Sequence, residues 1–151
     1  MKKPLYILTL SLLMSLALLG CQKPLDPLQD GTYEVTFHEP DPTGWTAFLV
    51  LHIEDASIVD VTYDYRGSGA QEGLLKSQDD AYAEAMFAVT GIKPVLYIQQ
   101  LEDALLRSQD PEKIDTISGA TTSTRDFKTF AKEALNASRQ GKMTPTILPQ
   151  P

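Results

Sequence analysis

The chain has 151 residues, and its 20 acidic side chains outnumber the 13 basic ones, so its formal net charge is −7. This charge argues against a nucleic-acid partner and against electrostatic docking on anionic lipid. The length suffices for one domain with a modest hydrophobic core, and the single cysteine excludes an internal disulfide.

The N-terminus has the pattern of a secretory signal. Two lysines precede a run from Leu5 to Gly20 that carries no charge and is shorter than the about 20 residues of a membrane-spanning helix. The run ends in Leu18-Leu19-Gly20-Cys21, which resembles the lipobox of bacterial lipoproteins. The resemblance implies a signal peptide over residues 1–20 and acylation of Cys21, which would anchor the protein in membrane lipid on the extracytoplasmic face. An ordinary secretory signal with an incidental cysteine is the alternative.

Proline content marks both ends of the expected domain. Residues 21–30 hold the cysteine and a tether that contains two prolines and shows no periodic pattern. Residues 142–151 contain three prolines and are expected to form a flexible tail outside the core. The folded domain is therefore expected to cover residues 31–141.

Three strands are expected to open this domain. The first alternates apolar and polar residues around Val35, which is typical of a sheet with one buried face. The second, from about Trp45 to Ile53, is nearly all apolar and is expected to be central. A turn at residues 54–57 leads to the third strand, from Ile58 to Tyr65. Its expected buried face is Val59, Val61, Tyr63 and Tyr65.

Helices dominate the second half. The first is expected to be capped by Ser77 and Asp80 and to bury Tyr82, Ala85, Met86 and Val89 before Gly91 ends it. Pro94 suits the first turn of the second helix, whose buried stripe is Ile98, Leu101 and Leu105. After a short strand at residues 114–117, the last helix is expected to bury Phe127, Phe130, Ala131, Ala134, Leu135 and Ser138. These elements predict an α+β fold, a small and mainly antiparallel sheet with helices packed on one face.

Small and hydroxylic residues fill positions 119–124, just where the last helix begins. Gly119 gives the backbone freedom that a tight loop needs. A helix N-terminus carries about half a positive charge, so N–H groups and hydroxyls gathered there favour a phosphate or carboxylate. The alternative is a helix that these hydroxyls cap without any ligand.

Asp115, two arbitrary residues and then Ser118-Gly119-Ala120-Thr121 resemble the flavinylation motif of the FMN-binding domain family. That family includes components of the sodium-translocating NADH:quinone reductase and of the Rnf complex. The Asp30-Gly31-Thr32-Tyr33 opening and the helix after the motif also resemble the family, so the similarity extends over the whole expected domain.

The resemblance implies that a flavin transferase uses FAD to attach FMN covalently to Thr121 through a phosphoester. Ser118, Gly119 and Ala120 would face the phosphate, with the hydroxyl of Thr122 among the groups that hold it. Asp115 would be the acidic position of the motif. In an isolated peptide nothing separates Thr121 from the hydroxyls that follow it, so this choice rests on the spacing from Asp115.

The resemblance further implies an electron-transfer flavoprotein rather than an enzyme with its own substrate. Its redox partners would be proteins or quinone-linked electron donors. Two alternatives stay open. One is a surface lipoprotein that uses the same fold without flavin as a binding module, and the other is a reversible FMN binder.

A flavin ring needs flat surfaces to stack on. Trp45, Tyr63, Tyr65 and the loop Gly67 to Gly69, expected to be mobile, are candidates, although strand alternation favours a core position for each aromatic. The two histidines, His38 and His52, are expected to face solvent or a polar rim rather than to bind a metal. No carboxylate pair has catalytic spacing and Ser118 lacks an identifiable histidine partner, so we expect neither a catalytic residue nor a metal site.

Overall fold

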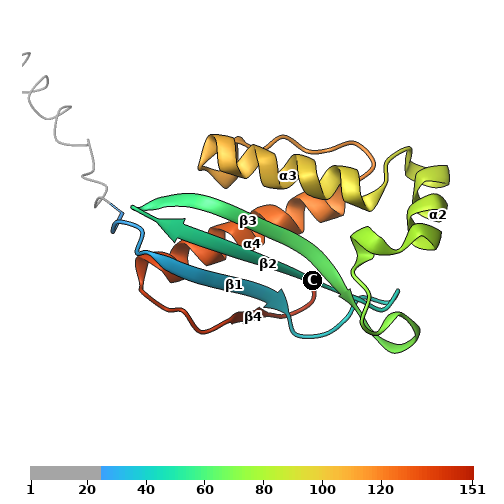
Figure 1. Cartoon of the computed structure of the whole chain (residues 1–151), viewed down its shortest axis with the longest axis horizontal. Helices are drawn as coiled ribbons and strands as arrows, with labels where there is room; N and C mark the ends of the chain where they lie inside the picture. Colours follow the sequence, from blue (N-terminus) through green and yellow to red (C-terminus); the bar gives the residue numbers. More distant parts are fainter. Residues whose placement is uncertain (1–24) are drawn as a thin grey trace, which may run out of the picture.

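The computed structural model describes residues 25–151, so the expected signal peptide and Cys21 lie outside the described residues. The strands are β1 (Gly31–Phe37), β2 (Trp45–Glu54), β3 (Ser57–Gly67) and β4 (Thr146–Leu148). The helices are α2 (Asp80–Thr90), α3 (Pro94–Ser108) and α4 (Thr121–Arg139), with 3-10 turns η2 (Gly69–Gln71), η3 (Lys76–Gln78) and η4 (Pro111–Lys113). The sheet has the order β3-β2-β1-β4, α3 and α4 pack on one of its faces, and α2 lies beyond the end of β3 (Figure 1). The predicted α+β fold with a mainly antiparallel sheet is confirmed.

One face of the sheet forms one side of the hydrophobic core, because apolar side chains lie in register on it across the three long strands. Val35 lies opposite Leu49, which lies opposite Tyr63, and all three are buried. β2 pairs with both β1 and β3, as its apolar sequence predicts. The apolar stripes expected on α3 and α4 pack on this face of the sheet. Their buried residues are Ile98, Leu101, Leu105, Phe127, Phe130, Ala131, Ala134, Leu135 and Ser138. No helix within residues 25–151 is long and apolar enough to cross a bilayer.

A bulge in the hairpin between β2 and β3 overturns one prediction. Ile53 pairs with Ile58, whereas the residue before Ile53 pairs with Asp60, so Val59 is an extra residue on β3. Ile58 and Val61 are both buried, and Val59 is 46% exposed. Placing Val59 on the buried face was wrong, because the extra residue shifts the alternation by one position.

α2 differs from the prediction in its cap and in its buried face. Its N-cap is Asp79, whose carboxylate accepts a hydrogen bond from the backbone N–H of Tyr82 at 2.9 Å, and not the predicted pair Ser77 and Asp80. Ala85 and Val89 were wrongly assigned to the buried face, since both are exposed, Val89 to 86%, whereas Tyr82 and Met86 are partly buried. The helix lies beyond the end of the sheet (Figure 1), and Tyr82 and Met86 are the residues by which it packs against the core.

The short strand predicted at residues 114–117 is absent, and these residues follow η4 as irregular chain. Ile114 is buried, so the apolar residue that suggested a strand packs into the core without joining the sheet. Side chains of α4 bind this segment instead of a neighbouring strand. The ammonium of Lys128 donates to the carbonyl of Ile114 at 3.1 Å, and Thr124 Oγ1 accepts from the N–H of Ile117 at 3.2 Å.

Both segments that flank the expected domain attach to it. In the expected tail, β4 pairs in parallel with β1, with Thr146 opposite Val35, so the tail does not lie outside the sheet. In the expected tether, Leu28 packs against the core and the N–H of Gln29 donates to Ser138 Oγ at 3.0 Å. The tail joins the sheet because β1 would otherwise present an unpaired edge, whereas the tether is held by its contacts with the core and with α4.

Candidate functional site

The loop that precedes α4 is held tightly against the end of α2. Gly119 has a φ of +78°, and a Cβ atom on it would lie 2.7 Å from the carbonyl oxygen of Thr90 and 3.0 Å from Cγ2 of Ile92. Only glycine combines this left-handed backbone with so close an approach. The N–H of Ala120 donates to the carbonyl of Ile117 at 3.0 Å and closes the turn. The glycine therefore fixes where α4 starts relative to α2.

Thr124 ties the same loop from inside. Its side chain is buried, its hydroxyl donates to the carbonyl of Ala120 at 2.9 Å, and its oxygen accepts from the N–H of Ile117 at 3.2 Å. Thr121 and Thr122 are exposed. The structure thus separates Thr124 from the two preceding threonines, which the sequence could not do. Thr124 is a structural residue, whereas the other two hydroxyls are accessible.

α4 begins without a side-chain cap. Its N-cap is Ala120, and no side chain in the described part of the chain caps it. The N–H groups of Thr121, Thr122 and Ser123 have no acceptor within the helix, because the first turn of any α-helix leaves its donors free. The structure therefore does not contain the helix capped by its own hydroxyls that the sequence left as an alternative. It contains an open helix N-terminus, which favours a negatively charged group.

Two clefts meet at this helix N-terminus. The smaller, of about 340 Å³, is lined by Met86 of α2 and residues 119–123. The larger, of about 380 Å³, runs from Thr122 and Ser123 towards the ends of β1, β2 and β3. Both clefts share Thr122 and Ser123, so a ligand held at the start of α4 could extend into either one. The larger volume lies in the range of about 300–1,000 Å³ that is usual for small-molecule sites.

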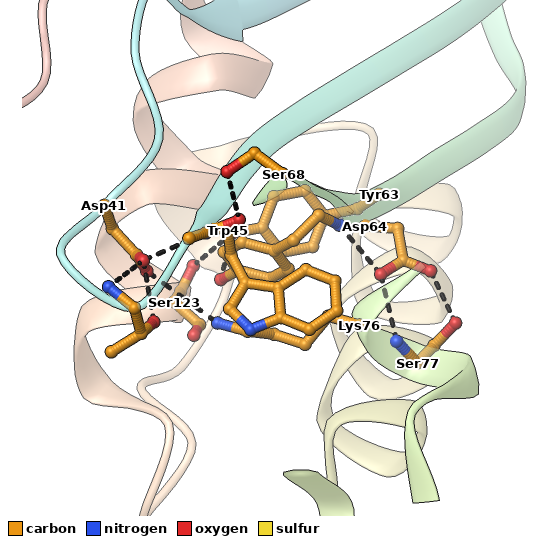
Figure 2. Close-up of polar contacts among 11 residues, drawn as sticks. Asp41, Trp45, Tyr63, Asp64, Ser68, Lys76, Ser77 and Ser123 are labelled. Atoms are coloured by element: carbon orange, nitrogen blue, oxygen red, sulfur yellow. Dashed lines mark hydrogen bonds and ion pairs between the residues drawn. The ribbon is translucent and has the colours of Figure 1, made fainter. Parts of the chain in front are cut away.

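Aromatic rings and one lysine form the larger cleft. Trp45 and Tyr82 contact each other edge to face with their ring centroids 5.9 Å apart, and Tyr65 completes the aromatic wall. Lys76 is only 5% exposed, and its ammonium lies 4.1 Å from the ring centroid of Tyr65 and 4.7 Å from that of Tyr82. Figure 2 shows Lys76 running alongside Trp45 towards Asp41, at a distance of 4.0 Å between Nζ and Oδ2.

Two buried tyrosines of β3 lie against the start of α4. The hydroxyls of Tyr63 and Tyr65 lie 2.8 Å apart, and Tyr63 also donates to the carbonyl of Ser123 at 3.2 Å. Burial raises the pKa of both tyrosines well above the ordinary value, so both stay protonated. These neutral donors orient the backbone of Ser123 without adding charge near the helix N-terminus.

Charged groups are few at the larger cleft and most are paired. Arg125 contacts Asp126 through Nε and Nη2, each 3.3 Å from Oδ1, and burial raises the pKa of Asp126 although Arg125 opposes the shift. Burial lowers the pKa of Lys76, although Asp41 opposes this shift too. The ammonium of Lys76 is thus the cation of the cleft that has no hydrogen-bonded carboxylate within residues 25–151.

The structure brings together only some of the residues that the sequence nominated. Trp45 and Tyr65 line the larger cleft, whereas Tyr63 lies beneath it in the core and the loop Gly67 to Gly69 does not reach it. That loop is tied to a neighbouring turn by two hydrogen bonds of 2.9 Å from Ser68 to the carbonyl of Gly44. The expected mobile loop is therefore anchored.

The residues of the motif also lie in different places. Gly119, Ala120, Thr121 and Thr122 line the smaller cleft. Ser118 is exposed, and Asp115 is exposed on a different cleft, between α3 and η4. The described part of the chain contains no group of three or more potential metal ligands, and His38 and His52 are largely exposed.

Sequence reasoning missed Lys76, Tyr82 and Asp41. They lie on η3, on α2 and in the turn before β2, and nothing in their local pattern distinguishes them from surface or core residues. Their convergence depends on the chain folding back after β3. Leu75 pairs with Arg66 in an isolated bridge, and Ser77 donates through both N–H and hydroxyl to the carboxylate of Asp64.

An accessible hydroxyl at an open helix N-terminus, next to a cleft lined by aromatic residues, would suit a ligand that has an anionic group and a flat ring. Residues 44–136 match the family described as the FMN-binding domain. The chain therefore belongs to the FMN-binding domain family. It is 36% identical over 115 residues to the 15 kDa lipoprotein of Treponema pallidum (strain Nichols). The matched region covers 76% of this chain and 79% of that protein. A crystal structure of a Clostridium perfringens protein superposes with a TM-score of 0.76 at 34% identity, covering 82% of this chain and 99% of that one.

Proposed function

We propose that this protein is a lipid-anchored extracytoplasmic electron carrier whose redox group is FMN, bound covalently to Thr121. The observation that carries the proposal is the exposed Thr121 at an uncapped helix N-terminus beside an aromatic cleft. The cofactor fits the residues present in two ways. The open N–H groups of α4 suit its phosphate, and the adjoining cleft offers its ring the partly exposed side chain of Tyr82, while Trp45 and Tyr65 of the same lining are buried.

The covalent bond has a physical reason. A helix dipole contributes about 0.3 to 1 kcal/mol to anion binding, which orients a phosphate but does not retain FMN at low concentration. In the proposed step, Thr121 Oγ bonds to the FMN phosphorus of FAD while the anhydride bond breaks and AMP leaves with the hydroxyl proton released to solvent. A flavin transferase would catalyse this step. The remaining single negative charge of the phosphodiester faces the free N–H groups of residues 121–123.

Electron transfer and location follow from the cofactor and the anchor. Bound FMN supplies one- or two-electron chemistry, and the chain supplies position and electrostatics. The 15 kDa lipoprotein of Treponema pallidum supports an anchor at Cys21, because its name describes the same modification that the Leu18-Leu19-Gly20-Cys21 stretch predicts. The donors and acceptors would be redox proteins or quinone-linked electron donors.

Mass spectrometry of the full chain co-expressed with a flavin transferase tests the attachment. We expect a mass increase of one FMN minus one water, and flavin fluorescence that stays with the protein after denaturation. Thr121→Ala should abolish both signals, while the matched variant Thr129→Ala should keep them, because Thr129 is an exposed threonine further along α4 and outside both the motif and the clefts. Folded Thr121→Ala protein that retains covalent flavin would contradict the assignment.

The two alternatives give different results in the same experiment. A reversible FMN binder is yellow when folded and loses its flavin on denaturation and filtration. A binding module without flavin shows the unmodified mass and normal folding. The match to the FMN-binding domain family favours a flavin ligand over the second alternative, and the accessible N–H groups at the start of α4 suit its phosphate.

A further inference from the structure

We infer that Lys76 contacts the flavin ring, donating a hydrogen bond to an acceptor atom on the ring edge and making the bound flavin easier to reduce. This inference rests on the proposed function, since it assumes flavin attached at Thr121. It concerns a residue outside the flavinylation motif, and it assigns the larger of the two clefts to the ring.

The first observation is that Lys76 is buried without a hydrogen-bond partner. Its side chain is 6% exposed, and the contact between its Nζ and Asp41 Oδ2 at 4.0 Å is too long for a hydrogen bond. Within residues 25–151 the ammonium has no other acceptor, although it carries three N–H donors. The Nζ atom is not one of the fully buried polar atoms of the described residues that lack a partner, so it opens to the cleft that Lys76 lines. The faces of Tyr65 and Tyr82 attract its charge but leave its N–H donors free for a molecule in that cleft.

The second observation is that Asp41 cannot turn to close this gap without losing its own contacts. Its Oδ1 accepts from the N–H of Thr43 at 2.8 Å, from the Thr43 hydroxyl at 2.7 Å and from the N–H of Trp45 at 3.1 Å. These bonds hold the turn that leads into β2. The carboxylate therefore remains a distant counter-charge to Lys76, and the donors of the ammonium stay available to a molecule in the cleft.

The third observation is that the backbone of Lys76 is fixed on both sides. Ser77 donates to the buried carboxylate of Asp64 through its N–H at 3.2 Å and its hydroxyl at 2.5 Å (Figure 2). On the other side, Leu75 bridges to Arg66 on β3. Lys76 thus enters the cleft from a rigid turn rather than from a mobile loop. A side chain held in this way can position a ligand without a large loss of conformational entropy on binding.

The cleft connects Lys76 to the attachment site. Thr122 and Ser123, which directly follow Thr121, form one end of its lining, and Lys76 with Trp45, Tyr65 and Tyr82 forms another part. A group anchored at Thr121 therefore has this aromatic cleft as its neighbour. Isoalloxazine suits the cleft in chemistry, because it is flat, can lie against the partly exposed ring of Tyr82, and carries along one edge carbonyl oxygens and ring nitrogens that can accept from Lys76.

The charge of Lys76 determines the direction of the effect. Reduction adds negative charge to the flavin ring, and a cation in a poorly solvated cleft stabilises negative charge more strongly than a cation in water does. The net charge of −7 acts in the opposite direction. Because the other lining cation, Arg125, is paired with Asp126, removal of Lys76 is expected to leave this opposing field without compensation.

The test compares midpoint potentials of the flavinylated full chain and two lysine-to-methionine variants. Lys76→Met keeps the length of the side chain and removes its charge. Lys142→Met is the matched control, since Lys142 is exposed and follows the opposite end of α4. We expect Lys76→Met to weaken the preference for reduced over oxidised flavin about tenfold, which for a two-electron couple is about 30 mV more negative. Lys142→Met should change it less than threefold.

Intact mass measured on the same samples separates the two ideas. Wild-type protein without added flavin mass overturns the proposed function itself. Flavinylated Lys76→Met with a potential equal to that of Lys142→Met overturns only the role of Lys76. If Lys76→Met does not fold, NMR of wild-type protein labelled on lysine nitrogen decides instead. Reduction of the flavin should raise the pKa of Lys76, and an unchanged pKa overturns the inference.

Discussion

Replacing Gly119 by alanine tests whether packing against α2, rather than ligand access, requires glycine in the motif. The alanine would have to keep the backbone φ of +78°, and its Cβ would meet the Thr90 carbonyl oxygen at 2.7 Å. The left-handed backbone costs about 1 to 2 kcal/mol for a residue with a side chain. Overpacking against a neighbour that cannot move freely costs about 1 to 3 kcal/mol more. We therefore expect Gly119→Ala to lower the free energy of unfolding by about 2 to 5 kcal/mol.

Gly91→Ala provides a control that isolates the first of these two costs. Gly91 ends α2 with a φ of +75°, as the sequence predicts, and an added Cβ there meets nothing within 4 Å. This variant should lose only the about 1 to 2 kcal/mol of the backbone conformation. The difference between the two variants is the cost of the contact with Thr90.

Urea unfolding of the chain produced without flavin transferase measures both variants. The single tryptophan, Trp45, is 1% exposed and reports the transition by fluorescence. Absence of flavin keeps ligand binding out of the comparison. Equal losses for Gly119→Ala and Gly91→Ala would refute the reasoning, because the contact at 2.7 Å would then have no energetic consequence.

Three further predictions concern stability. Thr124→Val removes the acceptor of the Ile117 N–H and should cost about 1 to 3 kcal/mol in urea unfolding. Thr124→Ser keeps the hydroxyl oxygen and should cost less. Equal losses for the two variants would contradict the role of the hydroxyl. Burial raises the pKa of Glu102 from 4.5 to about 6, although the hydrogen bond from the Tyr63 N–H opposes the shift. The folded state therefore holds the proton of Glu102 more tightly than the unfolded state does. The free energy of unfolding should accordingly fall as pH rises from about 4.5 to about 6. Because Glu102 is only partly buried and solvent screens it, the fall should be only about 1 kcal/mol, and thermal melts of Glu102→Gln should show it removed. Ile58→Ala should cost about 2 to 5 kcal/mol and Val59→Ala under about 1 kcal/mol in the same urea assay, and the reverse order would refute the bulge.

Local periodicity predicted most of the elements correctly, because each depends on residues a few positions apart. The stripe of α4, the alternation of β1 and the central place of β2 all follow from this short-range pattern. The predictions failed where a distant segment decides the outcome. Val59 was displaced by pairing with β2, and residues 146–148 joined the sheet because β1 had a free edge.

The sequence by itself determined the motif that nominates Thr121, since the spacing from Asp115 lies within seven consecutive residues. Only the tertiary structure decided which hydroxyls are free, because the burial of Thr124 depends on the loop that folds over it. The tertiary structure also decided which side chains line the larger cleft. Asp41, Lys76 and Tyr82 come from a turn, a 3-10 segment and a helix, and no local pattern can show that side chains so far apart in the chain meet at the start of α4.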